Sequence, residues 1–152
     1  MIKVLEKAGC TVTYNSRQTC CGQAAFNAGY WEESKAVCQK FISDFNGSDP
    51  IVAPSASCVG FVKNYYSRLF DNSSLHHEVQ EMKLRIFEFS SFLCHQIGVT
   101  QFGARLSGLA TYHDSCAGLR ECGIKEEPRK LLKNVGGLEL VEMNETETCC
   151  GF

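Results

Sequence analysis

The segment Thr-Cys-Cys-Gly occurs twice in this chain of 152 residues, at positions 19–22 and 148–151. Each copy follows a similar stretch, IKVLEKAGCTVTY before the first and RKLLKNVGGLELVEM before the second. The overlay aligns a lysine, a leucine and a glycine: Lys3 with Lys130, Leu5 with Leu132 and Gly9 with Gly136. PSASC at 54–58 also matches YHDSC at 112–116. This internal repeat predicts two related units, each with a Cys-Cys-Gly loop and a more distant cysteine.

Helices and strands are expected to alternate along the chain. Apolar periodicity and Gly or Pro breaks predict helices over 1–8, 23–45, 55–70, 79–97 and 126–137. Short β-branched or apolar runs predict strands over 10–14, 51–54, 108–113 and 138–143. Such alternation is typical of an α/β fold, here a short parallel sheet flanked by helices. Because ligands gather at the carboxyl ends of parallel strands, the cysteines should converge there.

Charge and hydropathy exclude several classes of protein. The formal net charge of −2 provides no basic field, so nucleic acid is not expected as a partner. No apolar run approaches the roughly 20 residues that span a bilayer, and the N-terminus has no signal-peptide core. We therefore expect a soluble, cytoplasmic protein. The basic residues of one predicted helix and its start are expected on a solvated face: Lys125, Arg129, Lys130 and Lys133.

The ten cysteines are the unusual part of the composition. Disulfide scaffolds are usually small, secreted and loop-rich, whereas this sequence predicts long helices and no export signal. In a reducing cytosol, clustered thiols more often serve metals or redox chemistry. No two cysteines have C-x-x-C spacing, which counts against a zinc ribbon, a thioredoxin-type centre or a ferredoxin.

Two adjacent cysteines can serve one centre only in a tight turn, because neighbouring side chains on a strand point to opposite faces. Gly22 and Gly151 permit the positive φ that such a turn needs. The helix predicted to begin near Gln23 would add unpaired N–H groups and a positive dipole end, which stabilise thiolates. The loops are therefore expected to hold a metal centre with thiolate ligands, each joined by a distant cysteine, Cys58 or Cys116.

Other interpretations stay open for some of these residues. A Cys-Cys pair can be a packing feature, since free cysteine behaves as a small hydrophobe, or a strained vicinal disulfide. His113 and Cys116 could form a catalytic pair, although no oxyanion or orienting motif accompanies them. Asp114 or Ser115 could cap the following helix. The remaining cysteines are expected to be structural: Cys10, Cys38, Cys94 and Cys122.

The segments TCCGQAAFNAGYW, PSASCVGF, TYHDSCAGLRECGIKEEPRKLL and ETCCGF resemble the cysteine-rich CCG-domain proteins. Within that family the chain is most similar to the iron–sulfur subunit of the bacterial lactate-utilisation complex, which is described as glycolate oxidase-like or as an Fe–S oxidoreductase. The cysteine-rich subunit of heterodisulfide reductase and the anchor subunit of anaerobic glycerol-3-phosphate dehydrogenase are more distant likenesses.

This resemblance implies tandem α/β CCG domains. The first would occupy 1–98 without its opening strand and cysteine, and 106–152 would be the N-terminal part of a truncated second domain. The implied ligands are Cys20, Cys21 and Cys58 at a first site and Cys116, Cys149 and Cys150 at a second. The implied cofactor is an iron–sulfur cluster of the 4Fe-4S type, with zinc as an alternative at the first site.

The implied activity is electron transfer during oxidation of L-lactate to pyruvate. The partners would be other subunits of a lactate-utilisation complex, including a ferredoxin-like iron–sulfur protein, and the isolated fragment is expected to be inactive. Heterodisulfide reductase members have a C-x-x-C element where Cys58 is followed here by Val59, Gly60 and Phe61. Three hypotheses therefore stay open: an iron–sulfur redox subunit, a zinc-stabilised interaction module without a redox role, and a thiol redox switch.

Overall fold

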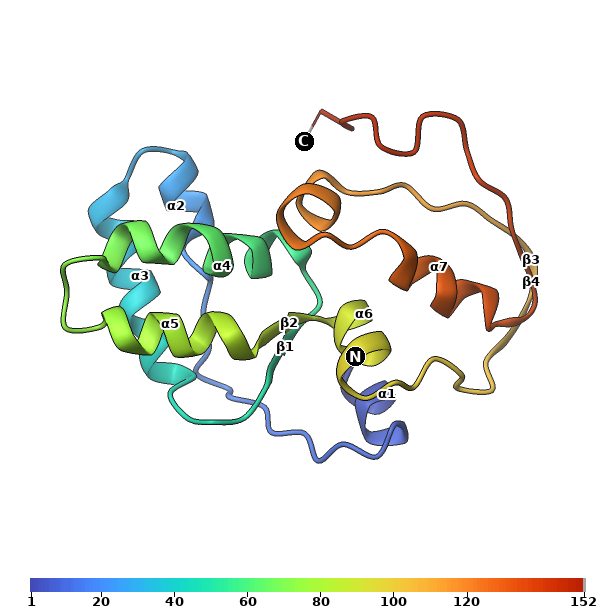
Figure 1. Ribbon diagram of the computed structural model, residues 1–152, viewed down its shortest axis with the longest axis horizontal. Coiled ribbons are helices and arrows are strands. Elements are labelled where there is room, and N and C mark those ends of the chain that lie inside the picture. The colour runs from blue at the N-terminus through green and yellow to red at the C-terminus, as the bar shows by residue number, and fades with distance from the viewer. Residues whose placement is uncertain (152) are drawn as a thin grey trace. The chain divides into compact units, whose positions relative to one another are not determined.

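The computed structural model describes residues 1–151 and divides into two compact units. The continuous unit is Thr13–Phe87, and the split unit combines Met1–Val12 with Glu88–Phe152. Helices and short strands alternate through both units (Figure 1). The chain therefore has the predicted α/β class, with short parallel strands.

The continuous unit packs helices around a small sheet. Its elements are α2 (Gln23–Asn27), α3 (Trp31–Asp44), β1 (Ile51–Ala53), α4 (Ala56–Phe70), α5 (His76–Arg85) and β2 (Ile86–Glu88). Strand β1 pairs with β2, and α4 contacts both β1 and α5. Helix α4 begins directly after β1 because Ser55 caps it, its hydroxyl accepting the Cys58 N–H at 3.5 Å.

Aromatic side chains fill the core of the continuous unit. The rings of Phe61 and Tyr66 lie edge to face with centroids 5.5 Å apart, and Phe41 contacts Tyr66 at 6.1 Å. Phe26 of α2 contacts Phe61 at 5.2 Å. Such pairs add to the free energy gained from burying apolar surface. Helix α4 is therefore the central helix of this unit, and its first turn carries Cys58.

The split unit is built around a β-α-β element. Its helices and strands are α1 (Ile2–Lys7), α6 (Phe89–Ser91), the π-helix η1 (Phe92–Gln96), β3 (Arg105–Ala110), the π-helix η2 (Ala117–Glu121), α7 (Glu126–Lys133) and β4 (Gly136–Leu140). Strands β3 and β4 run parallel, with Leu109 opposite Glu139. Helix α7 connects them and packs against β4 and α6, as a crossover between parallel strands requires.

Three predicted elements were wrong. The segment 10–14 forms no strand, since no strand pairs with its β-branched residues. The helix predicted over 23–45 is broken between α2 and α3 at Gly29, whose φ is +84°. The helix predicted over 79–97 ends at Arg85, because the next three residues form β2 and pair with β1.

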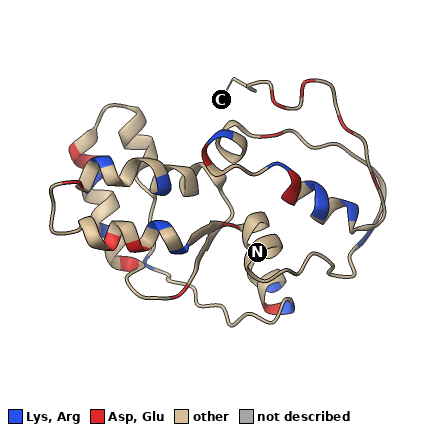
Figure 2. Cartoon of the chain, in the orientation of Figure 1, with Lys and Arg blue, Asp and Glu red and all other residues tan. Residues whose placement is uncertain are grey.

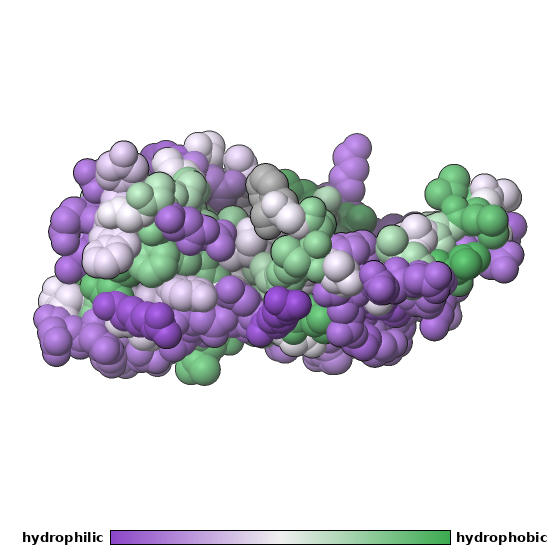
Figure 3. Space-filling view, turned by 90° about the horizontal axis from the view of Figure 1, so that it is seen from above, coloured by the Kyte–Doolittle hydropathy of each residue, from purple (hydrophilic) through white to green (hydrophobic). Residues whose placement is uncertain are grey.

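The surface mixes charges and contains some apolar area. Acidic and basic residues are interspersed along the chain (Figure 2), in keeping with the small net charge. Apolar surface appears among the hydrophilic surface (Figure 3), and Leu106 and Leu109 of β3 are 62% and 74% exposed. Along the described residues, no helix has the length and apolar character needed to cross a membrane.

Candidate functional site

The first Cys-Cys-Gly loop precedes α2, with Gly22 as the N-cap residue. Gly22 has a φ of +92°, and its N–H donates to Sγ of Cys20 at 3.4 Å. Cys20 is exposed, whereas Cys21 is buried. A Cβ atom on Gly22 would lie 2.7 Å from Sγ of Cys38. Both the positive φ and the lack of space therefore require glycine at this position.

Cys58 brings the distant thiol of the continuous unit to this loop. Its thiol lies close enough to that of Cys21 for the two to interact. The Cys21 thiol lowers the pKa of Cys58, with help from the Ser55 and Ser57 hydroxyls and against the effect of burial. The Cys58 thiol, together with burial, raises the pKa of Cys21. The pair thus offers a thiolate beside a thiol, and metal binding would release the remaining proton.

The second Cys-Cys-Gly loop repeats the local geometry of the first. Gly151 has a φ of +86°, and its N–H donates to Sγ of Cys149 at 3.5 Å. The Cys116 thiol lies close enough to that of Cys149 for the two to interact. The Gly151 N–H, followed by the Cys116 thiol, lowers the pKa of Cys149, and the same thiol contact raises the pKa of Cys116. The contact from the glycine N–H to the first cysteine of the loop is thus repeated. The loop cysteine that meets the distant thiol differs, being the second of the pair, Cys21, in the first loop and the first, Cys149, in the second.

Backbone contacts hold the Cys116 segment beside the segment that leads to the second loop. The Asp114 N–H donates to the Thr146 carbonyl at 2.9 Å. Nε2 of His113 lies 2.8 Å from the Thr148 carbonyl oxygen, so the imidazole ring contacts the backbone next to Cys149. These contacts place side by side two segments that are more than thirty residues apart in the sequence.

A buried ion pair supports the same region. Arg129 of α7 binds Asp114 through two hydrogen bonds of 2.7 Å and binds Glu142 at 2.8 Å through Nε. The Asp114 and Arg129 side chains are 0% and 6% exposed, and the Arg129 guanidinium lowers the pKa of Asp114. The solvated face predicted for this helix was wrong for Arg129, because its charge is matched by carboxylates after β3 and β4. Its basic neighbours are visible on α7 in Figure 2.

The six predicted ligands form two thiol contacts. These contacts are Cys21 with Cys58 and Cys116 with Cys149. Cys20 and Cys150 are exposed neighbours in the two loops. Within residues 1–151, no three His, Cys, Asp or Glu side chains are grouped closely enough to hold a metal ion. The donor chemistry, paired thiols of which one has a lowered pKa, suits a thiophilic metal.

The four cysteines predicted to be structural lie in different surroundings. Cys38 is fully buried in α3, and its thiol donates to the Cys21 carbonyl at 3.4 Å. The Cys94 thiol donates to the Glu127 carbonyl at 3.8 Å. Cys10 and Cys122 are half-buried. Nothing in the sequence indicated that Tyr66, whose hydroxyl binds the carbonyl of Cys21, contacts the first loop, because the two residues are 45 positions apart.

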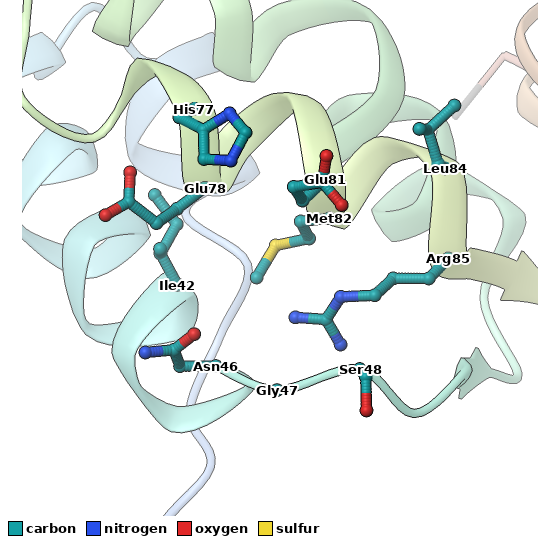
Figure 4. A pocket seen from close by; sticks show the side chains of 10 residues that line it. All are labelled: Ile42, Asn46, Gly47, Ser48, His77, Glu78, Glu81, Met82, Leu84 and Arg85. Atoms are coloured by element: carbon teal, nitrogen blue, oxygen red, sulfur yellow. The ribbon is translucent and has the colours of Figure 1, made fainter.

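A hollow of about 420 Å³ lies elsewhere in the continuous unit, between the end of α3 and α5 (Figure 4). Its lining includes Ile42, Met82 and Arg85 but no cysteine. The Arg85 guanidinium is bound to the backbone carbonyls of Phe45 and Asp49. Arg85 therefore fixes the loop after α3, and this hollow has no part in the thiol sites.

Comparison with known proteins identifies the repeat. The family described as "Cysteine-rich domain" (CCG) matches residues 1–63 and 110–152. "Lactate utilization protein A" of Oceanobacillus iheyensis is 38% identical over 151 residues, covering 99% of this chain and 62% of the relative. "Lactate utilization protein A 1" of Bacillus mycoides is 42% identical over 154 residues, covering 100% and 62%.

"Uncharacterized protein YkgE" of Escherichia coli is 41% identical over 152 residues, covering 99% of this chain and 64% of that protein. The chain thus spans less than two thirds of the length of these three relatives. No solved structure matches it.

Proposed function

Since this chain belongs to the cysteine-rich CCG domain family, we propose that it is an electron-transfer iron–sulfur component of a system that oxidises lactate. Two of the relatives carry the name of lactate utilisation proteins. Oxidation of L-lactate to pyruvate releases two electrons and two protons, so such a system needs an electron carrier. A glycolate oxidase-like reaction belongs to the same chemical class, the oxidation of a 2-hydroxy acid.

The observation that carries this proposal is the repeated thiol contact. Each Cys-Cys-Gly loop meets a cysteine that is more than thirty positions away, Cys58 in one case and Cys116 in the other. Packing alone would not require a thiol on both sides of each contact. In each pair one thiol has a lowered pKa, which favours the deprotonated form that metals bind.

The cysteines would have distinct roles in this function. Cys20, Cys21 and Cys58 would hold the centre of a first CCG domain at 1–98, and Cys116, Cys149 and Cys150 that of a second at 106–152. A bound 4Fe-4S cluster would supply one-electron redox chemistry. The Gly22 and Gly151 N–H groups, which donate to cysteine sulfur, would stabilise negative charge on that sulfur.

The proposed partners are the other subunits of a lactate-utilisation complex, one of them a ferredoxin-like iron–sulfur protein that exchanges electrons with these sites. The proposed location is the cytoplasm, where thiols remain reduced. In this arrangement the chain transfers electrons and leaves the bond-breaking steps on lactate to a partner.

A zinc-stabilised module without a redox role is the second candidate. One observation at the first site favours this candidate. Cys21 contacts a single distant cysteine, Cys58, and the next turn of α4 contains no further cysteine. Structural zinc sites use cysteine thiolates and release folding free energy when they form. Such a protein would be colourless and would lose thermal stability on chelation.

Serine variants test the assignment of ligands. We expect Cys58→Ser and Cys149→Ser each to remove most of the metal from their own site, because serine does not replace a thiolate ligand. Cys94→Ser is the matched control, since its thiol contacts only a backbone carbonyl in the hydrogen bonds observed. Metal per chain after anaerobic purification is the measurement. Equal metal content in Cys58→Ser, Cys149→Ser and Cys94→Ser would contradict the assignment.

A further inference from the structure

Three buried side chains converge on the backbone of the first Cys-Cys-Gly loop. The carbonyl oxygen of Cys21 accepts two hydrogen bonds, from Oη of Tyr66 at 2.7 Å and from Sγ of Cys38 at 3.4 Å. The next carbonyl, that of Gly22, accepts from Oγ of Ser34 at 3.0 Å. Tyr66, Cys38 and Ser34 are each 0% exposed. Helices α3 and α4 therefore hold two successive peptide groups of the loop.

This arrangement contains more polar groups than folding of the loop requires. One donor is enough to satisfy a buried carbonyl, so the second hydrogen bond to the Cys21 carbonyl is not needed to offset the cost of burying it. Burial raises the pKa of Tyr66, so its hydroxyl keeps its proton and remains a donor. The common effect of the three contacts is to fix the orientation of the two peptide groups that follow Cys21, and with it the direction of the Cys21 side chain toward Cys58.

We infer that Tyr66, together with Cys38 and Ser34, positions the Cys21 thiol for metal binding at the first site. This inference rests on the proposed function, because it assumes that Cys21 and Cys58 are metal ligands. Outer groups that orient a ligand typically change metal affinity by about 10- to 100-fold. Tyr66 is a positioning residue in this account, since it contacts the ligand's backbone and not the metal.

Cys38 has the same role and is not itself a ligand. Its sulfur faces the Cys21 carbonyl and lies 3.9 Å from Oγ of Ser34. A Cβ atom added to Gly22 would lie only 2.7 Å from this sulfur. A serine at position 38 would keep a donor in this place, whereas an alanine would not. The pair Cys38→Ser and Cys38→Ala therefore separates hydrogen bonding from ligation.

The test is anaerobic titration with Co²⁺ of the full chain carrying Cys149→Ser and Cys150→Ser, so that the signal comes from the first site. Thiolate-to-cobalt absorption bands report both affinity and ligand geometry. In this background Tyr66→Phe is expected to weaken Co²⁺ binding by about tenfold and to shift the absorption bands. Tyr65→Phe is the matched control, because it makes the same change one residue earlier on α4, on a half-buried ring that stacks on Phe61.

The outcomes separate the inference from the proposed function. Absence of thiolate-to-cobalt bands with the unaltered first site overturns both. If Tyr66→Phe has the same absorption bands and the same Co²⁺ affinity as Tyr65→Phe, the inference is overturned and the proposed function is not. If Tyr66→Phe does not fold, as judged by circular dichroism, the Cys38 pair decides. Cys38→Ser is expected to bind Co²⁺ more tightly than Cys38→Ala, and equal affinities of the two would overturn the inference.

Discussion

Arg129→Met is expected to lower the free energy of unfolding by about 3–5 kcal/mol, the usual cost of breaking a buried ion pair by removing one partner. Methionine has a similar length, so the packing of α7 is largely kept. What is lost is the partner of Asp114, whose side chain is fully buried and would keep an uncompensated negative charge. Because the Asp114 N–H also binds Thr146, the region around Cys116 should lose order.

Urea unfolding followed by circular dichroism measures this effect. Lys130→Met is the matched control, because it removes a positive charge from the next position of α7, where the side chain is exposed. Its effect should stay within about 0.5 kcal/mol. A loss in Arg129→Met no larger than in Lys130→Met would show that the buried ion pair does not stabilise this unit.

Gly22→Ala is the second substitution with a large expected effect, a loss of about 2–5 kcal/mol in the free energy of unfolding. A residue with a Cβ at a left-handed φ costs roughly 1–2 kcal/mol, and overpacking of a buried site typically adds about 1–3 kcal/mol. The added methyl group would meet Sγ of Cys38 at 2.7 Å and the Ser34 carbonyl oxygen at 3.1 Å. Neither atom is at the end of a long flexible side chain.

Gly29→Ala separates the two contributions. Gly29 has a similar φ of +84°, but nothing lies within 4 Å of the position of its Cβ. Its variant should therefore lose only the conformational part, roughly 1–2 kcal/mol. Trp31 is the only tryptophan and lies in the continuous unit, so its fluorescence during urea unfolding reports on this unit. Equal losses in the two variants would contradict the crowding described around Gly22.

The fold was predictable where local signals were strong. The apolar periodicity over 55–70 predicted α4, and the apolar runs and helical pattern after position 107 predicted β3, α7 and β4 close to their observed places. The helix predicted over 79–97 failed because a buried helix and a buried strand both place apolar residues at Ile86. Pairing with β1 makes this segment a strand, and β1 lies more than thirty residues earlier in the sequence.

The candidate ligands were predictable because Cys-Cys-Gly is a local motif that occurs twice. Their supporting residues were not. Tyr66 and Cys38 contact the carbonyl of Cys21 from 45 and 17 positions away, and nothing in their local sequence marks them. For Arg129 the sequence predicted an exposed side chain, since a lysine-rich helix usually faces solvent. Its burial depends on Asp114 and Glu142, which only the folded chain brings to it.

The most direct measurement of the central claim is the iron, zinc and acid-labile sulfide content of the unaltered chain after anaerobic purification. The proposed function predicts iron together with sulfide and a brown protein that bleaches in air. This colour should be kept in full in Cys94→Ser and should be weaker in Cys149→Ser, which keeps only the first site. Zinc without sulfide would contradict an electron-transfer role and favour the zinc-stabilised module. Neither metal, with a reversible disulfide among these cysteines, would leave the thiol redox switch as the function of the two loops.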